Sequence, residues 1–109
     1  MGESLSYKKK AIEELGIDEN IFDELLRCFV PEAEAEMQKL EEAIKADDFD
    51  AIAHIGHGLK GMAGNLRIVH MQYAAKAIEM IVRESKDKQA IIKKAAELRQ
   101  YLSELKKSI

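Results

Sequence analysis

Apolar positions recur every three or four residues along nearly the whole chain, which is the period of an amphipathic helix. The pattern breaks at only a few points, and these points carry residues that typically start or stop helices. It predicts one short helix followed by four longer ones. No run of alternating β-branched residues indicates a strand. The fold class expected from the pattern is therefore all-α.

The helix boundaries follow from these start and stop signals. The first predicted helix spans Leu5 to Leu15 and ends at Gly16. Asp18 is the expected N-cap of the second helix. Pro31 either kinks that helix or begins a new segment that runs to about residue 46, because proline cannot donate a helical hydrogen bond.

The second half of the chain is predicted in the same way. Asp47 and Asp48 form an acidic turn, and either can cap the third helix. A fourth helix is expected from about Val69 to Glu84. The last helix carries on one face Ile91, Ile92, Ala95, Leu98, Leu102 and Leu105. Four long helices with short connections bury their apolar stripes in an up-down antiparallel four-helix bundle, with the short N-terminal helix across one end.

Length and charge indicate a single domain and argue against a nucleic-acid partner. At 109 residues the chain has the usual size of one domain, so residues 1–109 are treated as a single helical domain whose motif-bearing core covers about 18–107. The net charge is −3, with both signs interspersed. Because no basic tract is present, no nucleic-acid partner is expected.

The absence of a membrane-spanning stretch and of cysteine pairs indicates the expected compartment. No apolar stretch reaches the roughly 18 to 20 residues that span a bilayer, so no membrane partner is expected. The single cysteine, Cys28, cannot form an intramolecular disulfide, which favours a reducing cytoplasm. The protein is also expected to be a monomer. Cys28 is expected to be buried and inert beside Phe29. Core packing is also expected for Met37, Met62, Met71 and Met80.

Glycines interrupt the helical pattern in the segment HIGHGLKGMAG, residues 54–64, at Gly56, Gly58, Gly61 and Gly64. Each glycine costs roughly 0.8 to 1 kcal/mol relative to alanine in a helix interior. Periodicity still favours a helix here, because the apolar side chains fall within an arc of roughly 60 to 80°. These are Ile52, Ile55, Leu59, Met62 and Leu66. The glycines therefore indicate that a small surface is needed.

The same helical count places His57 about 180° from the apolar stripe, so its side chain is expected in solvent. Lys60, Gly61 and Gly64 share its face. A neutral imidazole is a nitrogen nucleophile that can accept a phosphoryl group. Phosphoryl transfer needs in-line approach and nearby cations more than a general base. Lys60 can supply the cation, and the glycines let an acidic, metal-bearing partner pocket approach the imidazole.

The residues from His57 to Leu66, HGLKGMAGNL, resemble the HxLKG signature of the histidine-containing phosphotransfer family. The resemblance extends downstream through Met71, Ala75, Ile78 and Glu79, and upstream through Phe29, Glu32, Glu36 and Leu40. It covers most of the chain from about residue 20 to 82. The resemblance implies that His57 is the phosphorylated residue, Lys60 its electrostatic helper, and Gly61 and Gly64 the landing surface of the partner.

The function implied by the resemblance is that of a stand-alone histidine phosphocarrier in a two-component multistep phosphorelay. The phosphoryl group on His57 is expected to exchange with aspartates of response-regulator receiver domains, with a histidine kinase as a further partner. The chain has no nucleotide-binding motif, so we expect neither an ATP-dependent enzyme nor a cofactor of its own; Mg²⁺ is expected in the receiver pocket. The expected docking residues are His54, Gly58, Gly61, Gly64, Asn65 and Arg67.

One residue departs from the family pattern, and three alternatives to the phosphocarrier function remain open. Arg67 stands where the family usually has glycine, ten residues after the phosphorylated histidine, and is expected to affect partner choice. The chain can also be the phosphate-accepting domain of a chemotaxis-type histidine kinase, or a helical interaction module that is not phosphorylated. A metal site at His54, His57 and His70 is less favoured, because no acidic residues lie at Glu-x-x-His spacing on facing helices.

Overall fold

A computed structural model describes residues 2–109, with side chains from Lys8 onward. Within this range the backbone forms five α-helices and no strand, so the predicted all-α class is confirmed. The helices are α1 (Gly2–Leu15), α2 (Glu19–Lys45), α3 (Phe49–Asn65), α4 (Val69–Glu84) and α5 (Lys88–Lys107). The first helix begins three residues earlier than its apolar pattern predicts.

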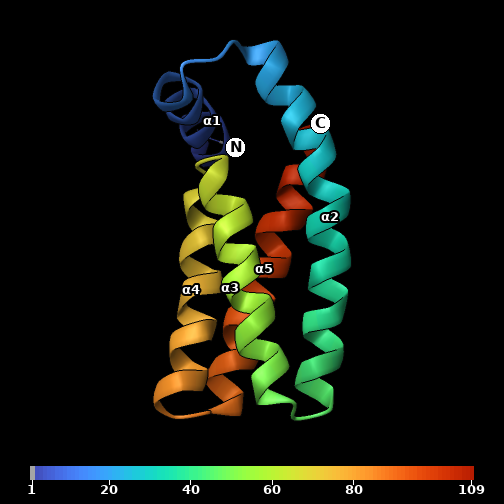
Figure 1. The fold of residues 1–109 in the computed structure, drawn as a ribbon. Coiled ribbons are helices and arrows are strands. Elements are labelled where there is room, and N and C mark those ends of the chain that lie inside the picture. The colour runs from blue at the N-terminus through green and yellow to red at the C-terminus, as the bar shows by residue number, and fades with distance from the viewer. Residues whose placement is uncertain (1) are drawn as a thin grey trace.

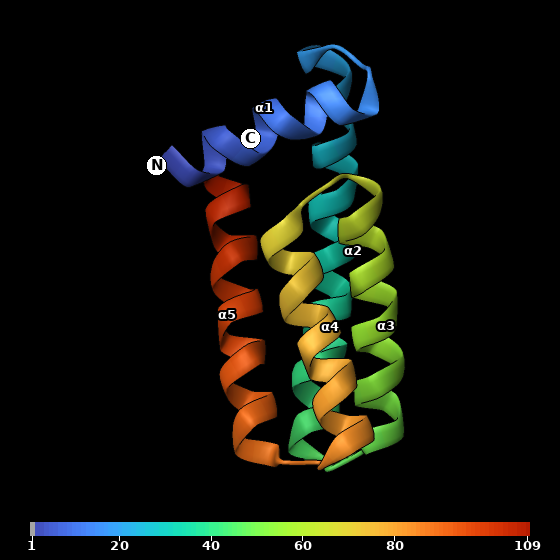
Figure 2. The same cartoon turned by 90° about the vertical axis from the view of Figure 1, so that its left-hand side faces the viewer.

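Helices α2 to α5 lie side by side, and α1 crosses one end of them (Figures 1 and 2). Each long helix contacts two others: α2 and α4 both pack against α3 and α5. The chain reverses direction in each short turn between these helices (Figure 1). The resulting body measures 41 × 22 × 22 Å, so every long helix keeps one side along the surface.

Aspartates begin three of the long helices. The side chains of Asp18, Asp48 and Asp87 accept hydrogen bonds from the backbone N–H three residues further on, at 2.9, 3.1 and 3.2 Å. Each bond satisfies a helical N–H that has no partner within the helix, which stabilises the fold by about 1 kcal/mol. Of the two candidate caps of α3, Asp48 is the one used, and Asp47 instead adopts a left-handed φ of 55° at the end of α2.

Pro31 does not begin a new segment, because α2 runs from Glu19 to Lys45 as one helix. The first turns of α2 are inclined to the rest in Figure 1, in agreement with the predicted kink. A kink is the expected result, because the ring removes one backbone donor and clashes with the preceding turn.

The core is purely apolar: none of the described side chains that it buries is polar or charged. Its largest fully buried members are Phe22, Leu26, Met37, Leu40, Ile52, Leu59, Met71, Ile78, Ile91, Leu98 and Leu102. Three packing predictions are wrong. Cys28 is exposed, and Met80 and Ile92 are 42% and 40% exposed, because neighbouring residues on each helix take the inward positions.

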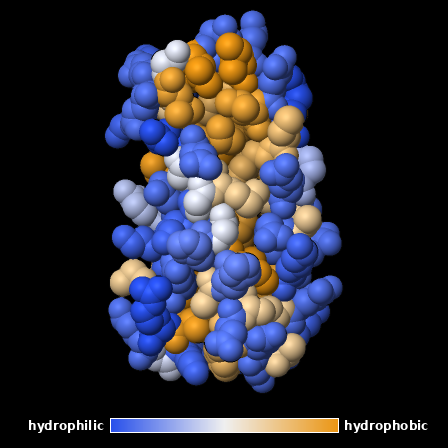
Figure 3. Space-filling model, in the orientation of Figure 1, coloured by the Kyte–Doolittle hydropathy of each residue, from blue (hydrophilic) through white to orange (hydrophobic). Residues whose placement is uncertain are grey.

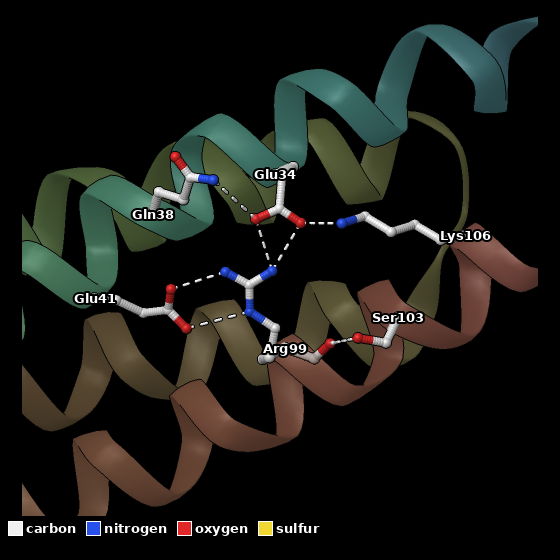
Figure 4. A network of polar contacts seen from close by, with 6 residues as sticks. All are labelled: Glu34, Gln38, Glu41, Arg99, Ser103 and Lys106. Carbon is white, nitrogen blue, oxygen red and sulfur yellow. Dashed lines mark hydrogen bonds and ion pairs between the residues drawn. The ribbon is translucent and has the colours of Figure 1, made fainter.

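An ion-pair network joins α2 to α5 (Figure 4). Nη1 of Arg99 donates to both oxygens of Glu34 at 2.7 Å, while Nε and Nη2 donate to the two oxygens of Glu41 at 3.2 and 2.8 Å. Lys106 also pairs with Glu34. Hydrogen bonds from Arg99 and Lys106 lower the pKa of the Glu34 carboxyl to about 2.

This network makes stability depend on pH. Because the folded pKa of Glu34 lies below its ordinary 4.5, the ionised carboxylate stabilises the fold above pH 4.5, and this contribution is lost as the pH falls toward 2. We expect Glu34→Gln to lower the free energy of unfolding at pH 7 by about 1 kcal/mol and to lose less stability than the wild type on acidification. Urea unfolding across this pH range measures both effects, with Glu42→Gln on the same helix as control. Parallel pH curves for wild type and Glu34→Gln would contradict the assignment.

Candidate functional site

His57 lies in the middle of α3, on the side that faces solvent. Its side chain is 65% exposed, whereas Ile55 and Leu59 on the opposite side of the helix are buried. The exposure predicted from helical periodicity is therefore confirmed. The helix places the imidazole on a lateral surface of the bundle, where a second protein can reach it.

The carboxylate of Glu79 on α4 binds the imidazole and Lys60 at the same time. Its Oε2 lies 3.1 Å from Nδ1 of His57, and its Oε1 accepts a hydrogen bond of 3.0 Å from Nζ of Lys60. Nη2 of Arg83 also lies 3.4 Å from Oε2. Glu79 is mostly buried, with 12% of its side chain exposed. The hydrogen bond from Lys60 is the main cause that lowers the pKa of the Glu79 carboxyl.

This contact fixes which imidazole nitrogen is available for chemistry. A lowered pKa keeps Glu79 ionised at neutral pH, and an ionised carboxylate only accepts hydrogen bonds. Nδ1 of His57 must therefore carry the proton that it shares with Glu79. In the neutral ring, the lone pair is then on Nε2, on the far side of the ring from Glu79.

The four glycines of α3 serve two different purposes. A Cβ added at Gly58 or Gly61 would meet nothing within 4 Å, so both positions leave open surface beside the imidazole. A Cβ at Gly56 would lie 3.3 Å from the backbone oxygen of Ala75, so this glycine lets α3 approach α4 closely. A Cβ at Gly64 would lie 3.1 Å from the side chain of Gln72.

Arg67 ends α3 in a left-handed conformation, with φ of 59°. The N–H of Ile68 donates to the carbonyl of Ala63, and that of Arg67 to Gly64, which is the Schellman arrangement. Glycine is the usual residue at this position of the motif, which gives a physical reason for the family's glycine. Here the side chain of Arg67 donates to the Gly64 carbonyl at 2.8 Å and pairs with Glu14 of α1 at 3.2 Å.

The predicted docking residues share the α3 side of the molecule. His54, Gly58, Gly61 and Asn65 are exposed, and Gly64 and Arg67 are partly exposed. The contacts of Arg67 are with its own turn and with α1 rather than with the imidazole. His70 does not join the other histidines, because its ring stacks on Tyr101 with centroids 5.3 Å apart. Among the described side chains, no group of three or more His, Cys, Asp or Glu residues could hold a metal ion.

Sequence reasoning missed Glu79 and Arg83 as members of the site. Glu79 was included only as part of the family pattern, and Arg83 was not considered. Glu79 is 22 residues from His57, so no helical spacing within α3 could reveal the contact. The i, i+4 spacing of Glu79 and Arg83 was the one local signal that linked these two residues.

An apolar groove of about 230 Å³ lies between α2 and α3. Leu25 and Phe29 of α2 and Met62 and Leu66 of α3 line it. Figure 3 shows hydrophobic residues gathered on this face of the molecule near the end where α1 lies. The exposed Cys28 also lines the groove, so the side chain predicted to be buried in the core instead faces this open surface.

The chain matches the sequence model of the Hpt domain over residues 24–108 and therefore belongs to the Hpt domain family. No curated protein and no solved structure matches it. Hpt domains are phosphocarrier modules that interact with receiver domains and kinases, so membership implies a phosphotransfer role in a phosphorelay. None of the helices in the described part of the chain is long and apolar enough to cross a membrane.

The two roles of the glycines can be separated by alanine substitution. We expect Gly58→Ala and Gly61→Ala each to raise the free energy of unfolding by roughly 0.5 to 1 kcal/mol, because alanine favours helix and no atom opposes its Cβ. Gly56→Ala should instead lower stability, because α4 backbone must move away. Chemical denaturation measures all three variants. A loss of stability in Gly61→Ala would show that the space around position 61 is not open, in contradiction to the structure.

Proposed function

We propose that this chain is a histidine phosphocarrier that accepts a phosphoryl group on Nε2 of His57 and exchanges it with receiver-domain aspartates. The observation that carries the proposal is the exposed imidazole whose Nδ1 faces an ionised carboxylate, which directs the nucleophilic nitrogen outward. In this proposal the four long helices form an up-down antiparallel bundle, and the protein acts as a cytoplasmic monomer.

The transfer step balances without a general base on this chain. Nε2 attacks the phosphorus of the receiver's aspartyl phosphate, the new P–N bond forms as the P–O bond breaks, and the aspartate leaves as a carboxylate. The imidazole keeps its Nδ1 proton and becomes a phosphorylated imidazolium. The Glu79 carboxylate, 3.1 Å from Nδ1, stabilises the positive charge that develops on the ring. The same step runs backward toward the next receiver.

Two cations flank the imidazole from opposite directions along the helices. Lys60 holds Oε1 of Glu79 and Arg83 approaches Oε2. Because α3 and α4 run in opposite directions, Lys60 lies one turn after His57, and Arg83 lies beside the turn that precedes it. Both side chains can reorient toward phosphoryl oxygens, and Arg83 does so most easily because it is 74% exposed. Mg²⁺ belongs, in this proposal, to the acidic pocket of the receiver.

The chemical identity of the phosphorylated group tests the proposal. Incubation with a receiver domain phosphorylated by acetyl phosphate should give an acid-labile, base-stable phosphohistidine, with the phosphorus on Nε2 in ³¹P–¹⁵N NMR spectra. His57→Gln should abolish the label and keep the helical fold, because the side chain is exposed. His54→Gln is the matched control on the same face. Label that persists in His57→Gln would refute the assignment, and an unlabelled wild type would favour a helical interaction module.

Glu79 should act as a positioning residue for the imidazole. We expect Glu79→Gln to slow phosphoryl transfer roughly 10- to 100-fold, because an amide no longer fixes the Nδ1–H form or balances the imidazolium charge. Transfer kinetics with the same receiver measure the rate, and ¹⁵N shifts of the His57 ring report the tautomer. Glu84→Gln, an exposed carboxylate on the same helix, should leave both unchanged. If Glu79→Gln transfers phosphoryl groups at the wild-type rate although the His57 ring populates both tautomers, the contact between Glu79 and His57 does not contribute to transfer.

A further inference from the structure

A second cavity, of about 180 Å³, lies between α4 and α5. The residues that line it are His70, Tyr73 and Ala74 of α4 and Lys94, Glu97 and Tyr101 of α5. At about 100° per residue, the three α4 residues lie roughly 120 to 180° around that helix from Glu79, which holds the imidazole of His57. The cavity is therefore separate from the candidate site, and its lining residues make none of the contacts of the imidazole.

Three of the lining residues carry aromatic rings. The rings of His70 and Tyr101 stack across the boundary between the two helices, with centroids 5.3 Å apart and planes inclined by 22°. Tyr73 is 65% exposed, more than any other large apolar residue among the described side chains. A ligand that covers Tyr73 removes apolar surface from water, and the face of an aromatic ring attracts cations. The rings therefore favour a ligand that is positively charged and can also stack.

The carboxylate of Glu97 supplies a negative charge beside these rings. From Lys8 onward, its Oε2 is the one buried side-chain oxygen or nitrogen that has no hydrogen-bond partner. Nζ of Lys94 lies 3.2 Å from this oxygen, which is close enough for an ion pair, but at an angle that makes no hydrogen bond. A carboxylate oxygen that is shielded from water without a donor is unfavourable, so a ligand that donates to it gains affinity.

The ion pair with Lys94 leaves the carboxylate available to a competing cation. The two side chains are 39% and 37% exposed and lie one turn apart on α5, so Lys94 can turn toward solvent without disturbing the core. An exposed pair of this kind contributes little to stability, and its loss is a small cost of binding. The site therefore needs a cation that bonds to Glu97 better than an ammonium group does.

A guanidinium group has this property. Its planar fork can donate two parallel N–H bonds to one carboxylate, while its faces stack on aromatic rings. A second ammonium group would only repeat the contact that Lys94 already makes. The cavity is also smaller than the roughly 300 to 1,000 Å³ of pockets that hold drug-sized ligands, so it accommodates the end of one side chain or a group of similar size.

We infer that the cavity between α4 and α5 binds a guanidinium group, which donates to Glu97 and lies against the rings of Tyr73 and Tyr101. Free arginine and an arginine side chain of another protein share this chemistry. They differ at Lys94, because the α-carboxylate of the free amino acid can pair with the displaced ammonium, whereas an arginine within a peptide chain has no such group. The inference does not depend on phosphorylation of His57.

NMR titration of the unphosphorylated chain tests the site with L-arginine hydrochloride. L-Citrulline, which has the same shape without the charge, is the matched control, with sodium chloride added to equalise the ionic strength. L-Arginine should shift the ring signals of Tyr73 and Tyr101 and saturate in the millimolar range, and L-citrulline should not saturate. Nα-acetyl-L-arginine amide represents arginine within a peptide chain. Tighter binding of L-arginine would identify the free amino acid as the ligand, and equal or tighter binding of the blocked form would identify a protein side chain.

Variants separate the carboxylate from the rings. Glu97→Gln should raise the dissociation constant of L-arginine roughly tenfold. Glu104→Gln, an exposed carboxylate two turns further along α5 and outside the cavity, should leave it unchanged. Tyr73→Leu keeps an apolar side chain without the ring and should raise the constant roughly two- to fivefold. Equal shifts with L-arginine and L-citrulline, or equal affinities of Glu97→Gln and Glu104→Gln, would overturn the inference and leave the proposed phosphocarrier function untouched.

Discussion

The contact between α3 and α4 at Glu79 is the interaction on which the candidate site depends. A single carboxylate holds Lys60 through one oxygen and His57 through the other, so the two side chains keep a fixed relation to each other. The absence of a side chain at Gly56 lets the two helices approach closely enough for this contact. Glu79 is only 12% exposed, and its ion pairs lie at the edge of an apolar core, where they are better shielded from water than fully exposed pairs.

The local features of this fold could be predicted from the sequence, because they depend on neighbours within one or two turns. Periodicity predicted the helices and the exposure of His57, and helix-start signals predicted a cap at Asp18 and another at Asp47 or Asp48. The cap at Asp87 was not predicted. The contacts that join helices could not be predicted in the same way. The Arg99 side chain reaches carboxylates 58 and 65 residues away, and Glu79 is 22 residues from His57, so both depend on how the helices pack. The exposure of Cys28 and Met80 follows from the same packing, since adjacent residues compete for the inward position.

Arg67 shows how a departure from a family pattern can be accommodated by the backbone. The position requires a left-handed conformation, in which a side chain costs about 1 kcal/mol relative to glycine. Arginine offsets part of that cost by donating to the carbonyl of Gly64 at the end of α3 and by pairing with Glu14. The substitution therefore changes the link between α1 and the turn after α3, about 15 Å along the helix from His57, and leaves the imidazole contacts untouched.

The polar contacts of the candidate site and the apolar groove lie on different sides of α3. The groups that act on the imidazole, Lys60 and Glu79, come from α3 and α4 and are tied to each other. The groove and Glu32 lie on the α2 side, beyond a strip of α3 where Gly58 and Gly61 present no side chain. Because no described hydrogen bond or ion pair crosses that strip, residues on the α2 edge can change without disturbing Nδ1 of His57. In the proposed phosphocarrier function, the contacts that prepare His57 are therefore independent of the residues that line the groove.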